Sequence, residues 1–365
     1  MFSKILTAAP VLALCLAAGP SWADSIDPEE FSADLAVGES TTIEKTVVIS
    51  EGGPTDAIID VHFLIDTSGS MGSEVNAAKA AATEVFTALN NSFGDVHASV
   101  GVFSEGAYLT PADDPSNRDN AIVVFGDGLT GNGATFQNEV NNVALSVPDG
   151  GFDFPESGYT AVDLAGGELD WRDGSSRFMF VFTDATAKGD LAGAQAALAE
   201  DDITLVALAY RGSDFSVQST YGDQLGAEVF SATASVEGIV DDVTDGILAG
   251  FANYDEVTVD GSAGMPLIDV SVVCTDADIG LCDGAFAMGD YDRSEERTFT
   301  FDVTFTRLAD GPSIFDTVAL VDGGVVARER DNFGAEVVPV PAALPLLMTA
   351  LGGLGFISRR RRRAA

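Results

Sequence analysis

The middle of the chain alternates between short, almost continuous apolar runs and longer segments with apolar residues at helical spacing. The run 58–65 is of the first kind and is expected to be a strand buried on both faces. The segment 74–89 is of the second kind. Further strands are predicted at 98–103, 121–125, 178–183 and 204–209, and further helices at 135–145, 160–169, 191–198 and 236–250. This alternation predicts an α/β domain over residues 56–252, with a doubly wound, mostly parallel sheet covered on both faces.

Beyond residue 254 the helical period disappears. Strands are predicted at 256–259, 268–273, 297–305 and 317–321, separated by Gly, Asp and Pro turns. This pattern is typical of a small β-sandwich, here over residues 253–337. The segment 24–55 is also rich in β-branched residues but is too short to fold alone. We therefore expect its strands to complete the sandwich, with the α/β domain inserted between the two halves of one β domain.

The first 23 residues have the physical features of a secretory signal peptide. Lys4 supplies the positive charge, and residues 5–18 form an apolar stretch too short to span a bilayer comfortably. Small residues precede a predicted cleavage site after Ala23. Two cysteines remain in the exported chain, Cys274 and Cys282, and they bracket a short loop. In an oxidising compartment this spacing favours a disulfide over two free thiols.

The C-terminal segment 338–365 is predicted to insert into the membrane. It consists of Val338-Pro339-Val340-Pro341-Ala342, an apolar run to Ile357 and five consecutive arginines. The run is near the minimum length for spanning a bilayer, about 17 residues, and the arginines are expected to stay cytoplasmic. A permanent inner-membrane anchor is one interpretation. The order of the three parts also resembles the VPLPA variant of PEP-CTERM sorting signals, with Val340 at a usual leucine position. That resemblance implies processing by an exosortase-type enzyme and a final place at the cell surface or outside the cell.

The net charge of the chain argues against some classes of binding partner. The formal net charge is −39, and without the leader and the terminal arginines 12 basic residues stand against all 57 acidic ones, a net charge of −45. Such a surface repels nucleic acid and anionic lipid, and it attracts cations. Solubility in a salty environment accounts for the charge equally well, so cation binding needs separate evidence.

That evidence begins with the loop after the first predicted strand of the α/β domain, Asp66-Thr67-Ser68-Gly69-Ser70. Ligands of open α/β sheets bind beyond the carboxyl ends of the strands, and this loop directs one carboxylate and two hydroxyls to that place. Hard oxygen ligands suit Mg²⁺, or Mn²⁺ and Ca²⁺. Taken alone, however, Asp and Ser before a helix are just as well explained as a helix cap.

Three motifs in the same order resemble the metal-ion-dependent adhesion site of von Willebrand factor A-type domains. They are Phe63-Leu64-Ile65-Asp66-Thr67-Ser68-Gly69-Ser70-Met71, then Gly151-Phe152-Asp153-Phe154-Pro155-Glu156, and finally Phe180-Val181-Phe182-Thr183-Asp184. The second is similar to a loop in the A-type domains of the integrin β family. The resemblance implies five metal ligands: Asp66, Ser68, Ser70, Glu156 and Asp184. Thr160 is the alternative to Glu156, because most A-type domains use a threonine.

The sequence departs from the integrin pattern where that pattern builds accessory metal sites. Gly151 stands where the integrin loop has an asparagine, and Ser73 and Glu74 stand where it has two aspartates. A complete second or third ion site is therefore not expected. Asp153, Thr160 and Glu74 remain candidate ligands of an accessory metal.

In A-type domains an acidic group of the partner completes the shell of the ion. The resemblance thus implies a surface adhesion module that captures a carboxylate-bearing protein, in an extracellular matrix or biofilm. The alternatives are a structural surface protein whose metal stabilises the domain, and a metal-assisted hydrolase. We expect no enzyme, because the two histidines offer no nucleophile–base pair: His62 falls in a buried strand and His97 in a turn. The resemblance also places a moving element, in domains that switch, at the helix 236–250.

Overall fold

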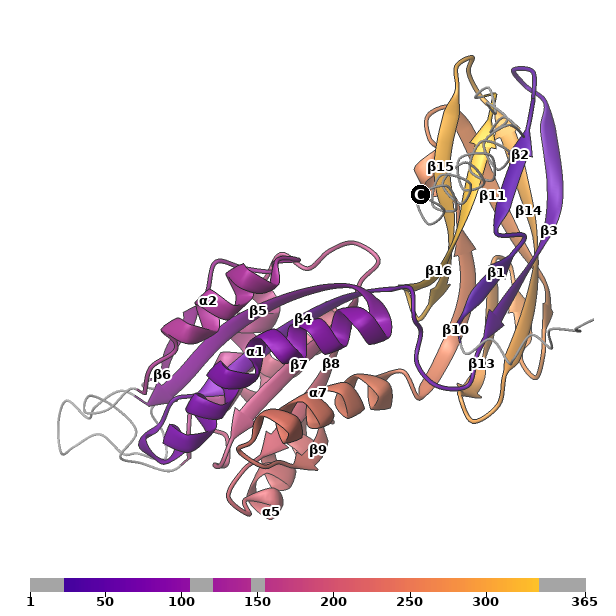
Figure 1. Cartoon of the computed structure of the whole chain (residues 1–365). Coiled ribbons are helices and arrows are strands. Elements are labelled where there is room, and N and C mark those ends of the chain that lie inside the picture. The colour runs from indigo at the N-terminus through magenta and orange to yellow at the C-terminus, as the bar shows by residue number, and fades with distance from the viewer. Residues whose placement is uncertain (1–22, 106–120, 146–154, 335–365) are drawn as a thin grey trace, which may run out of the picture.

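The computed structural model describes residues 23–105, 121–145 and 155–334. The predicted signal peptide, the predicted sorting signal and the candidate ligand Asp153 lie outside these residues. The chain forms an α/β domain and an elongated β-sandwich, and one end of the α/β domain meets the lower part of the sandwich in Figure 1. Within the described ranges, none of the helices combines the length and the hydrophobicity required to cross a bilayer.

The sheet of the α/β domain has six strands in the order β6-β5-β4-β7-β8-β9. All neighbouring strands are parallel except β5 and β6, which are antiparallel. The strands are β4 (Ala57–Asp66), β5 (Gly94–Glu105), β6 (Ala121–Phe125), β7 (Ser176–Thr183), β8 (Ile203–Ala209) and β9 (Glu228–Ser231). The central strands β4, β7 and β8 are buried almost throughout, as their continuous apolar sequences predict.

Helices cover both faces of this sheet. One face packs against α1 (Gly72–Phe93), α2 (Gly133–Asn142) and α7 (Val236–Gly250), and the other against α3 (Gly158–Glu168) and α4 (Leu191–Glu200). The short helices α5 (Asp214–Val217) and α6 (Asp223–Leu225) follow β8. The predicted doubly wound α/β architecture is confirmed, and each long helix lies within a few residues of its predicted range.

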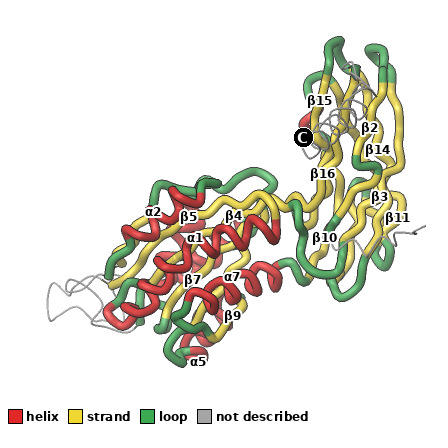
Figure 2. The backbone as a smooth tube through the Cα atoms, in the orientation of Figure 1, coloured by secondary structure: helices red, strands yellow, loops and turns green. Residues whose placement is uncertain are grey.

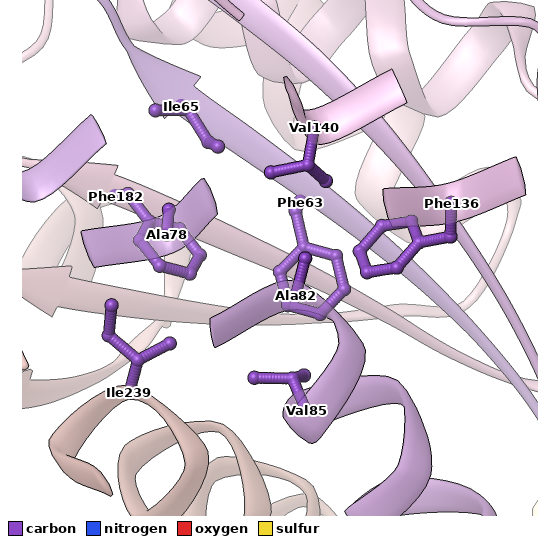
Figure 3. A pocket seen from close by; sticks show the side chains of 9 residues that line it. All are labelled: Phe63, Ile65, Ala78, Ala82, Val85, Phe136, Val140, Phe182 and Ile239. Atoms are coloured by element: carbon purple, nitrogen blue, oxygen red, sulfur yellow. The ribbon is translucent and has the colours of Figure 1, made fainter. Parts of the chain in front are cut away.

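The core beneath α1 is almost filled. Side chains from α1, α2, α7 and the sheet surround a small apolar cavity of about 20 Å³, as Figure 3 shows. The residues that line it are Phe63, Ile65, Ala78, Ala82, Val85, Phe136, Val140, Phe182 and Ile239. A gap of this size holds at most one water molecule, and its lining offers a water no polar partner. The cavity is therefore a packing gap and not a ligand pocket.

The β-sandwich has two sheets, and each combines strands from the N-terminal and C-terminal parts of the described chain. One has the order β1-β3-β14-β11 and the other the order β12-β13-β10-β15-β16-β2. The strands are β1 (Ser25–Asp27), β2 (Glu30–Ala33), β3 (Ser40–Ile49), β10 (Asn253–Asp260), β11 (Ile268–Ala277), β12 (Leu281–Asp283), β13 (Phe286–Asp292), β14 (Arg297–Arg307), β15 (Ser313–Val321) and β16 (Gly324–Phe333). The tube in Figure 2 shows the strand-rich sandwich beside the mixed helices and strands of the α/β domain.

The N-terminal strands complete the sandwich. β3 runs antiparallel to β14 over ten residue pairs, and β2 runs parallel to β16. The α/β domain is consequently an insertion between β3 and β10. Its two connections to the sandwich lie together at the end of the sheet where β4 begins and α7 ends (Figure 1). The carboxyl ends of the parallel strands therefore lie at the far end of the domain.

The junction between the domains is held by polar contacts. Arg293 donates two hydrogen bonds of 2.8 Å to the two carboxylate oxygens of Asp24, and it also bonds the carbonyl oxygens of Ser50 and Gly52. The backbone amide of Val325 donates to the carbonyl of Gly174 on the α/β side. These contacts fix the entry to the inserted domain against the sandwich.

Several elements differ from the sequence-based prediction. The strands β9, β12, β13 and β16 are not predicted, because they are short or carry many polar residues. The placement of His97 in a turn is wrong, because His97 lies within β5 and pairs with Asp60 of β4 in the register. The predicted disulfide is present: Cys274 on β11 is bonded to Cys282 on β12.

Candidate metal centre

The loop after β4 is folded by its own polar side chains. The backbone amide of Ser68 donates to Asp66 Oδ1 at 2.8 Å, and a short 3-10 helix, Gly69–Met71, then leads into α1. Asp66 and Ser68 are buried and Ser70 is half-buried. The turn places the Ser68 and Ser70 hydroxyl oxygens 3.2 Å apart, at the carboxyl edge of the sheet.

The loop after β7 brings in the second carboxylate. β7 lies beside β4 in the sheet, so Asp184 arrives next to the first loop although 114 residues separate it from Ser70. The Ser70 hydroxyl donates to Asp184 Oδ1 at 2.9 Å. Thr183, the last residue of β7, donates its hydroxyl to Asp66 Oδ2 at 2.8 Å. The structure therefore joins Asp66, Ser68, Ser70 and Asp184 in one hydrogen-bonded group.

This group carries more negative charge than its surroundings balance. Burial raises the pKa of Asp66 to about 6, although hydrogen bonds from Ser68 and Thr183 lower it, and the charge of Asp184 adds to the rise. Burial also raises the pKa of Asp184, against the lowering effects of Ser70 and Arg211. Two carboxylates thus face each other across neutral hydroxyl donors. A divalent cation with hard-oxygen preference fits this donor set and would remove the repulsion.

Glu156 lies buried on a neighbouring loop. Its backbone amide donates to the Thr186 carbonyl at 3.0 Å, and its carbonyl accepts from the Lys188 amide at 2.7 Å. These bonds tie the loop to the segment that follows Asp184. The charges of Asp66 and Glu156 both act on the buried Tyr221 hydroxyl, whose pKa they raise together with burial, the largest cause. Glu156 therefore lies on a loop that is bonded to the segment after Asp184.

The accessory candidates occupy separate places. The Thr160 hydroxyl accepts a long hydrogen bond of 3.4 Å from the Asp190 amide, in the first turn of α3. Glu74 is buried in the first turn of α1 and accepts from the Ser73 hydroxyl at 2.8 Å. Its charge contributes to the raised pKa of Asp184, which places Glu74 on the same side of the sheet edge as the main group. Within the described ranges, no three or more His, Cys, Asp and Glu side chains cluster closely enough to hold a metal by themselves.

The sequence of this region matches a known family. Residues 60–209 match the family model of the von Willebrand factor A domain, a range that includes both loops of the candidate site. The chain contains a von Willebrand factor A domain. The match does not address the integrin-like form of the loop that carries Glu156. No curated protein sequence matches the chain.

Solved structures with A-type domains resemble the chain at low sequence identity. A von Willebrand factor type A protein from Catenulispora acidiphila is 14% identical, with a TM-score of 0.40, over 86% of this chain and 74% of that one. The pilus adhesin SpaC from Lactobacillus rhamnosus GG is 13% identical, with a TM-score of 0.37, over 81% of this chain and 45% of that one. Proximal thread matrix protein 1 from the mussel byssus is 13% identical, with a TM-score of 0.37, over 55% and 47%. This chain spans less than half of the last two.

Two residues at the candidate metal centre of the A domain are not predicted from the sequence. Thr183 holds one oxygen of Asp66, and a threonine at the end of a strand gives no signal of this role. Arg211 follows β8 with a left-handed backbone, φ 59°. Its Nε lies 3.4 Å from Asp184 Oδ2, and its terminal nitrogen donates to the Ser70 carbonyl at 3.2 Å. A half-exposed cation thus stands beside the acidic group and partly balances its charge.

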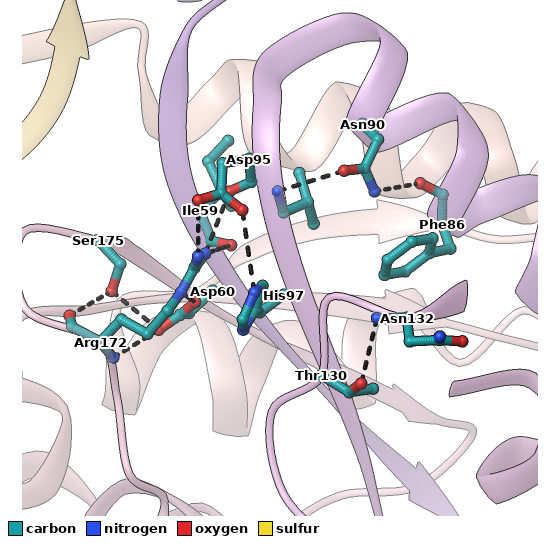
Figure 4. A network of polar contacts seen from close by, with 11 residues as sticks. Ile59, Asp60, Phe86, Asn90, Asp95, His97, Thr130, Asn132, Arg172 and Ser175 are labelled. Carbon is teal, nitrogen blue, oxygen red and sulfur yellow. Dashed lines mark hydrogen bonds and ion pairs between the residues drawn. The ribbon is translucent and has the colours of Figure 1, made fainter. Parts of the chain in front are cut away.

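The opposite end of the same strand carries a different acidic centre. The carboxylate of Asp60 is fully buried and accepts from the Arg172 amide at 2.7 Å, the Arg172 Nε at 2.6 Å and the Ser175 hydroxyl at 3.0 Å. Arg172 also bonds the carbonyls of Ile59 and Asp95, and Figure 4 shows this network with His97 at its margin. Here the A domain satisfies a buried carboxylate completely with its own donors.

Proposed function

We propose that the A domain is a metal-dependent protein-binding module of an exported surface protein, and that it captures an acidic group of its partner. The hydrogen-bonded group of Asp66, Ser68, Ser70 and Asp184 at the free end of the sheet supports this proposal most strongly. Its two carboxylates are largely buried, and the half-exposed Arg211 contacts only Asp184, whereas Arg172 bonds the carboxylate of Asp60 directly at the other end of β4. Carboxylates whose charge is only partly balanced are typical of a functional site.

Each residue of the group has a role in this proposal. Asp66, Ser68 and Ser70 would hold a Mg²⁺ ion directly, or Mn²⁺ or Ca²⁺, with Asp184 and Glu156 acting directly or through water. When bound, the ion supplies a positive centre that attracts an external carboxylate. Thr183 keeps Asp66 oriented, and the Ser70 hydroxyl keeps Asp184 within reach. Because the two hydroxyls are neutral, the group does not cancel the charge of the ion completely.

The charge of the whole chain makes the ion necessary for an acidic partner. A protein with a net charge of −39 repels carboxylates at long range. A local positive centre at the end of the domain would offset this repulsion over the short distances at which contacts form. The same charge supports a protein partner over nucleic acid.

The exported location rests on independent observations. The first 23 residues have the pattern of a signal peptide, and the bond between Cys274 and Cys282 is of a kind that persists outside the reducing cytoplasm. The segment 338–365 would hold the chain in the inner membrane until an exosortase-type enzyme processes it. Replacing Pro339 and Pro341 should then leave a larger, membrane-retained form. Unchanged mass and release would contradict processing.

Metal binding is tested by titrating Mg²⁺ into the purified, chelator-treated protein in a calorimeter. We expect one saturable site that disappears in Ser68→Ala. Asp95→Asn is a matched control, because Asp95 is a half-exposed acid at the opposite end of the same sheet and its loss should leave the site intact. If Ser68→Ala binds Mg²⁺ as the native protein does, the assigned site is wrong.

Capture of a partner is tested with the immobilised protein and the extracellular proteins of the cells that produce it. We expect a partner that binds in Mg²⁺, is released by EDTA and is not retained by Asp66→Ala. Binding that survives both chelation and mutation would refute the adhesion mechanism. A metal that raises thermal stability without any metal-dependent partner would favour the structural alternative. We do not propose catalysis, since His62 lies inside the sheet bonded to Ser99, and His97 lies near the start of β5, at the end of the strand away from the candidate site.

A further inference from the structure

The core of the β-sandwich encloses three ionisable side chains from its two sheets. Lys45 extends from β3 in one sheet, and Glu329 and Asp331 extend from β16 in the other. All three side chains have no exposed surface. Lys45 Nζ is in direct contact with Glu329 Oε2 and lies 3.9 Å from Asp331 Oδ1. Long charged side chains are almost never buried so completely without a specific reason.

The surroundings of this triad are apolar and aromatic. The Lys45 nitrogen lies 5.8 Å from the ring centre of Phe31 on β2 and 5.2 Å from that of Phe305 on β14. Thr317 on β15 donates its hydroxyl to Asp331 Oδ2. The two oxygens of Asp331 are thereby distinguished: one is held by Thr317, and the other faces Lys45. Among the described residues, Glu329 Oε1 has no hydrogen-bond partner.

Burial favours the neutral forms of Lys45 and Asp331. It lowers the pKa of Lys45 to about 8, and the charge of Asp331 opposes that change. It also raises the pKa of Asp331, against the lowering effects of Thr317 and Lys45. An amine and a carboxylic acid in water exist as an ion pair, whose hydration prevents condensation. In a water-free core that hydration is lost, and the fold holds the two groups in contact, so that their reaction is intramolecular.

We propose that Lys45 and Glu329 condense to an intramolecular isopeptide bond between Nζ and Cδ, with Asp331 as the proton carrier. A proton passes first from the lysine to the glutamate, which gives a neutral amine and a neutral carboxylic acid. The nitrogen lone pair then attacks Cδ, and the carbonyl electrons move to Oε1. Asp331 takes one proton from the nitrogen and passes it to the hydroxyl on Oε2. The bond from Cδ to Oε2 breaks, one water leaves, the carbonyl re-forms at Oε1, and Asp331 is ionised again.

The geometry favours Glu329 over Asp331 as the acyl group. Glu329 Oε2 contacts the amine, and its other oxygen lacks a competing donor among the described residues. Asp331 is farther away, and Thr317 engages one of its oxygens. The bond would join positions 284 residues apart and would close a covalent ring around the entire inserted A domain.

The mass of the native protein tests the proposal directly. The full chain is exported from its host, purified and reduced, and its intact mass is measured under denaturing conditions. We expect a mass lower by one water molecule than the processed sequence requires. Peptide mapping should place the loss in a branched peptide that links Lys45 to Glu329. An intact mass equal to that of the sequence, or a link at any other pair of residues, would overturn the proposal.

Variants test the assigned roles. Lys45→Arg should have the full mass of its sequence, because an arginine cannot form this bond. Asp331→Asn should retain the full mass or lose water far more slowly, because an amide cannot carry the proton. Asp316→Asn is the matched control, since Asp316 is a solvent-exposed acid on β15 paired with Arg330 and should form the link as the native chain does. Rapid and complete water loss in Asp331→Asn would show that Asp331 does not carry the proton.

Discussion

Two aspartates at opposite ends of β4 differ in how the protein satisfies their buried carboxylates. Asp60 and Asp66 are both fully buried. Asp60 receives three hydrogen bonds, two of them from Arg172. Asp66 receives neutral donors alone among its recorded bonds and has a second carboxylate, Asp184, beside it. A buried carboxylate is costly unless it is paired, so the fold carries a larger electrostatic cost at Asp66 than at Asp60.

The charge around Asp60 and the charge around Asp66 also have different consequences for the stability of the protein. At the Asp60 end, the buried carboxylate is paired with Arg172 within the protein. At the Asp66 end, the protein keeps electrostatic repulsion in its metal-free state. Stability lost at a site of this kind is regained when the ligand binds, which couples metal binding to folding. The following predictions test this contrast.

The largest effect is expected from Asp60→Ala. The change leaves the Arg172 guanidinium and the Ser175 hydroxyl without their buried partner, and it should lower the free energy of unfolding by about 3–5 kcal/mol. Urea denaturation with and without Mg²⁺ measures it, and the loss should be equal in both. As a control, Asp95→Asn removes a half-exposed partner of the same arginine and should cost about 1 kcal/mol or less. If Mg²⁺ restored the stability of Asp60→Ala, the contrast between a structural Asp60 and a metal-linked Asp66 would be wrong.

In the absence of metal, Asp66→Asn is expected to raise the free energy of unfolding, whereas Asp60→Ala lowers it. Because burial raises the folded-state pKa of Asp66 from 3.8 to about 6, the folded protein keeps a proton that the unfolded chain releases in this range. Metal-free stability therefore falls as the pH rises from about 4 to 6, by on the order of 2–3 kcal/mol. The neutral asparagine should remove this loss.

Thermal unfolding in EDTA at pH 7 and pH 4 measures this effect. The variant should be more stable than the native protein at pH 7 and similar to it at pH 4, and Mg²⁺ should no longer raise its melting temperature. A variant that is less stable than the native protein at pH 7 in EDTA would show that ionised Asp66 serves the fold.

A smaller change in stability is expected from Ser70→Ala. The hydroxyl is half-buried and bonds Asp184, so its loss should change the metal-free free energy of unfolding by about 1 kcal/mol or less. Mg²⁺ affinity should nevertheless fall at least tenfold, because a direct ligand is removed. Calorimetric titration and urea denaturation of the same sample give both values. Equal losses in stability with and without Mg²⁺ would assign Ser70 a structural role.

The smallest effect is expected from Arg211→Ala. Arg211 is half-exposed and lies beside Asp184, so solvent weakens its attraction to that carboxylate. Without it, Asp184 should be more available to a cation, and Mg²⁺ affinity should rise about two- to fivefold, corresponding to less than about 1 kcal/mol. Calorimetric titration checks the change. Weaker Mg²⁺ binding would show that Arg211 supports the site instead of competing with the ion.

The fold was predictable wherever one physical rule dominates a segment. The continuous apolar sequence of β4 and the helical period of α7 give their positions directly, and α7 has the predicted bounds 236–250. β16 was not predictable in this way. Its inward positions include Glu329 and Asp331, which are charged, and Lys45 from the opposite sheet is what allows them to be buried. Such long-range compensation leaves no signal in the local pattern.

The same limit applies to the candidate site. Asp66 and Asp184 each end a buried strand, so their meeting at one sheet edge follows from the pattern once the strands are known to be parallel. Arg211 depends on a left-handed backbone after β8, and its approach to Asp184 cannot be derived from spacing. The metal-binding roles of Asp66, Ser68, Ser70, Asp184 and Glu156, and those of the accessory residues, stay predictions.

The insertion of the A domain has a mechanical consequence. Both connections of the domain leave from the end of the sheet opposite the candidate site (Figure 1). A partner held at the site would therefore pull the domain along its strands, and the tension would divide between two chain segments. One enters β3 and the other β10, which belong to different sheets of the sandwich. A tensile load at one point of the A domain is thus distributed across both sheets of the β-sandwich.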